Sequence, residues 1–288
     1  MKNKIHHYNV KLFNSLNIFY RQAGTPNAPV ILMIHGFPTS SFMFRNLIPI
    51  LAEKYRVIAP DLPGFGFSDM PDSSEFNYTF DNLAQIIQLF IEALSIKKFA
   101  LYIFDYGAPV GLRLALANPE NITGIIAQNG NAYEEGLSEA WDPIRKYWEE
   151  PSRSNRDALR DFMSLRMTKF QYEHGVTDSS LIAPETYTLD QYFLDRPENV
   201  EIQLDLLRDY KNNVELYPVF QEYFRKWRPK LLAVWGNKDP FFLVAGAEAY
   251  KRDNPNATVR IYDTGHFVLE THPTEIGEEI IGFMQELV

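Results

Sequence analysis

The sequence predicts an α/β fold: a doubly wound, mostly parallel sheet of eight strands flanked by helices, with one helical insertion. Two observations predict it. Short unbroken apolar runs alternate with helical stretches along the chain, which is typical of buried parallel strands joined by helices. This alternation stops near Asn131 and resumes at Lys230, so a differently built segment separates two parts of one core.

The N-terminal residues predict an antiparallel pair of strands at one edge of the sheet. Ile5–Phe13 and Leu16–Arg21 alternate polar and apolar residues, and the turn-prone Asn14 and Ser15 separate them. The elements expected next are, in chain order, strand Val30–Ile34, helix Phe42–Glu53, strand Arg56–Ala59, helix Phe80–Leu94, strand Phe99–Phe104, helix Ala108–Ala117 and strand Ile122–Gln128.

The segment 132–228 has a different character. It is rich in aromatic and charged residues, shows helical periodicity in Asp157–Phe170 and Glu198–Tyr210, and contains little that resembles a buried strand. Because parallel sheets bind ligands at the carboxyl ends of their strands, we expect 132–228 to form a helical cap there, between core parts 1–131 and 229–288. The second core part is expected to hold strands Lys230–Trp235 and Thr258–Tyr262 and helices Ala245–Asp253 and Pro273–Leu287.

Composition excludes several classes of function. The 288 residues carry a net charge of −9 and no cysteine, so the chain has no disulfide, thiolate nucleophile or cysteine-based zinc site. No run of Lys or Arg exceeds two residues, which argues against nucleic-acid and anionic membrane partners. The basic N-terminus lacks an apolar run of signal-peptide length, and no stretch is apolar enough to span a membrane. We expect a cytoplasmic protein, as a monomer or homodimer.

Asp105 is the candidate nucleophile. The buried run Phe99–Phe104 leads directly into a helix, and Asp105 occupies the turn with Gly107 two residues on, where a side chain would crowd the bend. This is the position of a nucleophile elbow, with aspartate in place of the usual serine and Ile103 where many elbows carry a small residue. The alternative is a helix N-cap, a common place for aspartate.

Two later segments supply partners for Asp105. Asp239 follows one apolar strand and His266 another, which gives the chain order nucleophile, acid, histidine. A carboxylate can attack a tetrahedral carbon to form an alkyl ester, and His266 would then activate the water that hydrolyses it, oriented by Asp239. The alternatives are an Asp-Pro turn at Asp239 and a loop histidine at His266.

The loop after Val30–Ile34 completes the candidate site. His35–Pro38 can direct the backbone N–H of Phe37 at the same point as the N–H of Tyr106, which together would form an oxyanion hole. The alternative is a simple turn between strand and helix, because glycine and proline occur in turns of every kind.

Five motifs resemble the epoxide hydrolase and haloalkane dehalogenase branch of the α/β-hydrolase family: HGFPTSS (His35–Ser41), DLPGFGFS (Asp61–Ser68), FDYG (Phe104–Gly107), GNKDP (Gly236–Pro240) and GHF (Gly265–Phe267). The resemblance covers the core. It implies the α/β-hydrolase fold with a helical cap, Asp105 as nucleophile, His266 as base, Asp239 as its partner, and Phe37 and Tyr106 as oxyanion donors. It also implies a small-molecule substrate and water as partners, with no cofactor and no metal.

The resemblance leaves two chemistries open. A dehalogenase of this family holds its halide with a tryptophan after the nucleophile and a second Trp or Asn, where this chain has Tyr106 and Phe37. The tyrosine hydroxyl is a possible donor, and Trp141 at the start of the cap is a possible second donor or a packing residue.

An epoxide hydrolase of this family instead uses two cap tyrosines as acids for the ring oxygen. The segment Tyr210–Asn212 resembles the sequence around one of these family tyrosines, with Tyr210 in the tyrosine's place. The second family tyrosine has no clear counterpart here, because Ile144 occupies its position. Three other tyrosines are possible substitutes or packing residues: Tyr147, Tyr187 and Tyr192. We predict an epoxide hydrolase-like enzyme, with Trp141 and Tyr147 in the substrate pocket. The alternatives are a haloalkane dehalogenase and a ligand receptor or cofactor-free oxygenase on the same fold.

Overall fold

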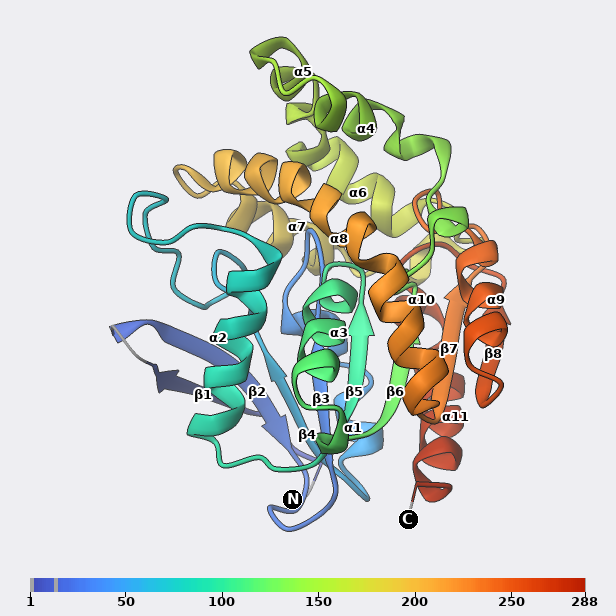
Figure 1. The fold of residues 1–288 in the computed structure, drawn as a ribbon. Coiled ribbons are helices and arrows are strands. Elements are labelled where there is room, and N and C mark those ends of the chain that lie inside the picture. The colour runs from blue at the N-terminus through green and yellow to red at the C-terminus, as the bar shows by residue number, and fades with distance from the viewer. Residues whose placement is uncertain (1–2, 13–14, 288) are drawn as a thin grey trace.

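The structure is a computed structural model that describes residues 3–12 and 15–287. One sheet of eight strands runs through it in the order β1-β2-β4-β3-β5-β6-β7-β8 (Figure 1). The strands are β1 His6–Lys11, β2 Asn17–Ala23, β3 Val30–Ile34, β4 Arg56–Pro60, β5 Phe99–Phe104, β6 Ile122–Gln128, β7 Leu231–Gly236 and β8 Ala257–Tyr262. β2 is antiparallel to both β1 and β4, and the other pairs are parallel. The predicted mostly parallel sheet of eight strands is confirmed.

The α-helices lie on both faces of this sheet and at one of its ends. They are α1 Ile48–Leu51, α2 Phe80–Ala93, α3 Gly107–Ala117, α4 Asp142–Glu149, α5 Arg153–Ala158, α6 Leu165–Glu173, α7 Pro184–Leu194, α8 Asn199–Trp227, α9 Val244–Asp253, α10 Val268–Thr271 and α11 Pro273–Gln285. Residues of α2, α3 and α9 share a core with one face, and residues of α1 and α11 share a core with the other.

Strand β5 shows why the central strands are continuously apolar. All six of its residues are buried. Leu101 and Ile103 point into the core beneath α2, α3 and α9, whereas Tyr102 and Phe104 point into the core beneath α1 and α11. Because successive side chains of a strand face opposite sides, a strand covered on both faces needs an apolar residue at nearly every position.

Some element boundaries differ from the prediction. The first predicted strand shortens to His6–Lys11, and Phe13 and Asn14 lie outside the described residues. The helix predicted over Phe42–Glu53 is wrong: the chain forms a 3₁₀ turn at Ser41–Phe44 and then the short α1. Pro49 lies in the first turn of α1, because inside a longer helix it would remove a hydrogen bond and clash with the preceding turn.

Helices α4 to α8 connect β6 to β7. In Figure 1 they lie at the end of the sheet toward which β5 and β6 point, and the second half of α8 descends beside α3 and α9. The helix predicted over Asp157–Phe170 is divided, because Ser164 caps the start of α6 by accepting a hydrogen bond from Met167 N. The division into 1–131, 132–228 and 229–288 stays a prediction. No helix in the described part of the chain is long and apolar enough to span a membrane.

Candidate active site

Asp105 lies in a strained turn between β5 and α3. Its φ of +49° is in the left-handed region, which residues with a Cβ atom rarely adopt. Two glycines allow the turn to pack closely against the loop after β3. A Cβ atom on Gly107 would lie 2.2 Å from the carbonyl oxygen of Ile34, and one on Gly36 would lie 2.3 Å from Asp105 Oδ1. The turn therefore places the Asp105 side chain at the end of the sheet, where it lines a cavity, as an elbow requires.

One carboxylate oxygen of Asp105 is held by two backbone donors. Phe37 N and Tyr106 N each donate to Oδ1 at 2.6 Å. These are the two N–H groups that the sequence predicts as oxyanion donors, and the structure brings them to one oxygen. Burial raises the pKa of Asp105 to about 6, although the charge of His266 and the two N–H bonds act in the opposite direction.

The other oxygen of Asp105 faces His266. His266 Nε2 lies 3.9 Å from Asp105 Oδ2, beyond hydrogen-bonding distance, and Nε2 has no hydrogen-bond partner among the described residues. The opposite nitrogen, Nδ1, lies 2.7 Å from Asp239 Oδ2. Burial lowers the pKa of His266, but the charge and hydrogen bond of Asp239, together with the charge of Asp105, outweigh it and leave the pKa raised. The imidazole is therefore fixed at one nitrogen and free at the other.

Asp239 is held on both oxygens. Oδ1 accepts from Phe241 N at 2.7 Å and Phe242 N at 3.1 Å, and Oδ2 accepts from Asn129 Nδ2 at 2.7 Å in addition to facing His266. Asn129, at φ +42° directly after β6, also accepts from Gly236 N through its own Oδ1. Protein donors thus orient Asp239, and no group of three His, Asp or Glu residues in the described chain is arranged to hold a metal.

Asn129 was not among the predicted site residues. The sequence could have suggested Asn129, because it lies in a short polar run that follows the apolar part of β6. β6 pairs with β7, and the loop after β7 carries Asp239. Residues after neighbouring parallel strands meet at one end of a sheet.

A small cavity opens in front of Asp105, with a volume of about 30 Å³. Phe37 and Tyr106 form its floor with Asp105. Its other walls are mostly apolar and come from the segment 132–228 and the loop after β7: Trp141, Ile144, Phe162, Leu207 and Phe241. The cavity also has a polar wall residue that the sequence gave no reason to single out, Gln171 on α6. The lining suits a small, largely apolar molecule.

Trp141 and Tyr147 have different surroundings. Trp141 lines the cavity, but its Nε1 donates to the carbonyl oxygen of Phe241 at 3.1 Å. Tyr147 is not among the cavity-lining residues, and its hydroxyl accepts a hydrogen bond from Arg156 Nη1 at 3.0 Å. Arg156 also pairs with Glu201 and Asp205 on α8, so Tyr147 belongs to a cluster that joins the helices of this segment.

Tyr210 packs directly above the elbow. Its ring centroid lies 5.9 Å from that of Tyr106 and 4.5 Å from that of Trp141, and its hydroxyl lies 3.4 Å from the hydroxyl of Tyr217, which accepts from Asn131 Nδ2 at 3.2 Å. Burial raises the pKa of Tyr210 well above its usual value, with further contributions from Tyr217 and the charge of Asp105.

The other two tyrosines considered from the sequence have surface or structural contacts. Tyr192 is 68% exposed, and the ring of Tyr187 lies beneath Lys169 Nζ at 5.4 Å. Tyr217, which the sequence did not suggest, is the tyrosine that the structure brings to Tyr210, because the two are seven residues apart on α8 and share one face of the helix.

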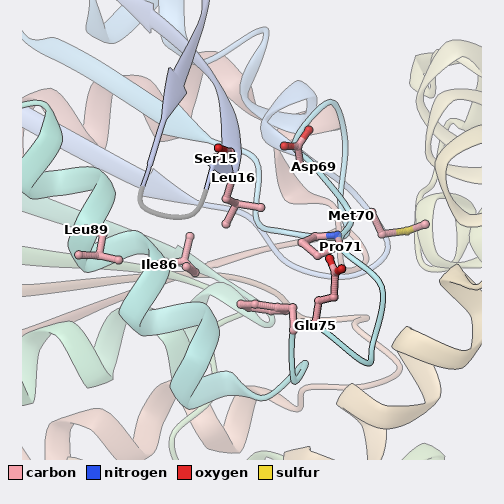
Figure 2. Close-up of a pocket in the computed structure, with 9 residues that line it drawn as sticks. Ser15, Leu16, Asp69, Met70, Pro71, Glu75, Ile86 and Leu89 are labelled. Carbon is pink, nitrogen blue, oxygen red and sulfur yellow. The ribbon is translucent and has the colours of Figure 1, made fainter.

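A wider hollow of about 600 Å³ lies elsewhere, between the β1–β2 connection, residues 69–76 and α2 (Figure 2). It contains none of the predicted site residues. Its Asp69 has a structural role, because Oδ2 accepts from both the backbone and the side chain of Asn17 at 2.8 and 3.0 Å. We therefore place the candidate site at the small cavity over Asp105.

The fold and the strand–turn–helix around Asp105 define the class of this protein: it is a hydrolase of the α/β-hydrolase fold. Residues 29–273 match the family model described as alpha/beta hydrolase fold, and the chain belongs to that family. The predicted fold class and the family resemblance are thus confirmed.

Its relatives carry hydrolase names. The chain is 47% identical over 286 residues to the uncharacterized hydrolase YNR064C of Saccharomyces cerevisiae, which covers 97% of each chain. It is 24% identical over 295 residues to a haloalkane dehalogenase of Psychrobacter cryohalolentis, which covers 95% of this chain and 89% of that one. The crystal structure of haloalkane dehalogenase DbeA from Bradyrhizobium elkani matches with a TM-score of 0.83 at 21% identity over 99% of both chains, which shows a shared fold.

Proposed function

We propose that this hydrolase uses Asp105 as a nucleophile and acts on a small epoxide. One observation carries the proposal: Asp105 Oδ2 and His266 Nε2 lie 3.9 Å apart without a hydrogen bond, and Nε2 has no hydrogen-bond partner in the part of the chain that the structure describes. A nucleophile that attacks carbon has no proton to give up, so it needs no hydrogen bond to the histidine. The histidine is needed in the next step, when water attacks the ester.

The reaction follows from the two oxygens of Asp105. Oδ2 attacks a ring carbon, the carbon–oxygen bond of the epoxide breaks, and the departing oxygen takes a proton from Tyr210, which leaves an ester on Asp105. His266 then takes a proton from water, and the hydroxide attacks the ester carbonyl. The negative charge develops on Oδ1, where the N–H groups of Phe37 and Tyr106 already lie at 2.6 Å. When this intermediate collapses, the bond between Cγ and the diol oxygen breaks, and that oxygen takes the proton held by His266. The proton left on the new Asp105 carboxyl group restores Tyr210, so the diol leaves and all three residues return to their starting state.

Two contacts favour an epoxide over a haloalkane. The indole N–H of Trp141 is already donated to Phe241 O, so it is not free to hold a halide. Tyr210 keeps a phenol above the ring of Tyr106, and its raised pKa keeps that phenol protonated near neutral pH, so the proton is present when the ring opens.

Haloalkane hydrolysis is the second candidate. It is favoured by the relatives named haloalkane dehalogenase at 24–26% identity and by the hydroxyl of Tyr106, which is buried without a hydrogen-bond partner among the described residues. That hydroxyl would be the halide donor in this reaction.

We also propose that residues 132–228 act as a cap, between core parts 1–131 and 229–288. Five cavity-lining residues of this segment support the proposal: Trp141, Ile144, Phe162, Gln171 and Leu207. With them in place water is largely excluded, which strengthens the electrostatic interactions around Asp105.

The deciding experiment traps the ester. The His266→Gln variant is exposed briefly to a panel of small epoxides and haloalkanes, digested, and analysed by mass spectrometry, with Asp105→Asn/His266→Gln as the control. An epoxide adds its whole mass to the peptide that contains Asp105, whereas a haloalkane adds its alkyl group without the halogen. If the wild type turns over a compound that leaves no adduct on Asp105 in this variant, the aspartate is not the nucleophile.

A further inference from the structure

Gln171 is a buried polar side chain whose amide nitrogen makes no hydrogen bond to the described residues. It is 3% exposed, and Nε2 has no acceptor among the described residues. It lies on α6 and lines the same cavity as Asp105. A buried amide that lacks a partner destabilises a protein, so such a group calls for an explanation, and a ligand is one of the few that fit.

The neighbouring residue holds α6 in place. The ring of Tyr172 stacks on that of Phe267 with centroids 3.8 Å apart and planes 10° apart. Its hydroxyl donates to Asp190 Oδ2 at 2.6 Å and also lies 3.3 Å from Thr39 Oγ1. Because Phe267 follows His266 and Thr39 belongs to the loop that carries Phe37, this contact fixes α6 against the two loops that form the site. Gln171 is therefore presented to the cavity by a helix that is anchored to the core.

The surroundings of Gln171 specify its ligand. Asp105 is the charged residue of the cavity lining, and its Oδ1 is already held by two N–H groups. No cation lines the cavity in the described chain, so an anionic substituent would be buried beside a carboxylate without a countercharge. A neutral oxygen, by contrast, can accept the free N–H of Gln171 without that penalty.

We propose that Gln171 is a substrate-binding residue, which selects small epoxides that carry a neutral oxygen substituent beside the ring, as a glycidyl alcohol or ether does. This inference rests on the proposed function, in which Tyr210 serves the ring oxygen and Asp105 attacks the ring carbon. Gln171 binds the substituent, and so it favours one placement of the ring over Asp105.

The test compares glycidol with 1,2-epoxybutane, which is the same size but has a methyl group in place of the hydroxyl. The wild type should prefer glycidol by about 10- to 100-fold in kcat/KM, because the analogue leaves the buried amide unpaired. Gln171→Leu should remove most of this preference by lowering kcat/KM for glycidol, while the value for 1,2-epoxybutane changes by less than about threefold. Gln171→Met gives the same readout if the leucine variant does not fold.

Gln191→Leu is the matched control. Gln191 is also a buried carboxamide of this segment, but it donates to Met163 O at 3.0 Å and accepts from Thr168 Oγ1 at 2.9 Å. Its replacement should lower the melting temperature and leave the preference for glycidol unchanged.

Two results would overturn the inference. One is a preference that is absent in the wild type or unchanged in Gln171→Leu and Gln171→Met. The other is an equal loss of kcat/KM for glycidol and 1,2-epoxybutane in the Gln171 variants, which would place Gln171 at the ring oxygen instead. Trapping of the ester separates this failure from failure of the proposed function. An adduct on Asp105 with an unchanged preference rejects the role of Gln171 alone, whereas the absence of any adduct rejects the nucleophile.

Discussion

Replacing Asp105 by asparagine should abolish turnover and, near neutral pH, make the fold more stable. In the wild type, the backbone nitrogens of Phe37 and Tyr106 lie 2.6 Å from Asp105 Oδ1. The asparagine amide keeps an oxygen that can accept these two hydrogen bonds, but it is a poor nucleophile. It also removes a buried negative charge. A group whose charge raises activity and lowers stability is expected at an active site.

The pKa of Asp105 gives the magnitude. Burial raises it from 3.8 to about 6, so the ionised form is less favourable in the folded chain than in the unfolded one. The difference corresponds to about 3 kcal/mol, the cost of ionising Asp105 in the fold at neutral pH. The sign follows from proton binding: between these two pKa values the folded state binds more protons, so wild-type stability falls as pH rises through this range and then levels off.

Urea denaturation of the wild type and Asp105→Asn measures this difference. Asparagine does not titrate, so the variant should exceed the wild type by up to about 3 kcal/mol near pH 7.5, and the gap should shrink toward pH 4, where Asp105 is protonated in the folded chain. A gap that does not change with pH, or a variant that is less stable near pH 7.5, would refute the reasoning. Full activity in freshly prepared protein would refute the role of Asp105. Slow recovery on standing would not, since an activated water can hydrolyse the amide.

Three further outcomes follow. His266→Gln should form the ester in a stoichiometric burst without turnover, measured by rapid quench, because alkylation needs no base and hydrolysis does. The rate of alkylation in that variant should fall about tenfold for each pH unit below the pKa of Asp105, which rises from its wild-type value once the lowering effect of His266 is gone. It should show no alkaline decline while Tyr210 stays protonated. A rate that is flat from about pH 5 to 8 would contradict this. Tyr210→Phe should lower the rate of epoxide ring opening by roughly 10²-fold, with little change in melting temperature. The dehalogenase would be favoured if this rate were unchanged and Trp141→Phe could not turn over haloalkanes.

Much of the site followed from short stretches of sequence. The elbow at Asp105 is predictable because the buried strand, the turn and Gly107 are neighbours in the chain, and the bend has few solutions. Asp239 and His266 each follow an apolar strand, and parallel strands deliver the residues after them to one end of the sheet. The structure places these three side chains together, with Nδ1 of His266 2.7 Å from Asp239 and Nε2 3.9 Å from Asp105.

The segment 132–228 was less predictable. Its helical periodicity indicated helices, but a helix can present several polar or aromatic residues to a neighbour, and the sequence does not say which one meets which partner. Tyr147 faces Arg156 and not the cavity, and Tyr210 meets Tyr217, because the packing of α4, α5 and α8 decides these contacts.

The sequence by itself determined the class of fold, the order of the strands along the chain and the three residues at the end of the sheet, because each depends on patterns of neighbouring residues. The tertiary structure decided what is free to react. The indole N–H of Trp141 is donated to a carbonyl one hundred residues away, whereas Nε2 of Gln171, which lines the same cavity as Asp105, has no partner among the residues described. Whether a buried donor is satisfied depends on groups that only folding brings within 3 Å of it, and no local pattern records them.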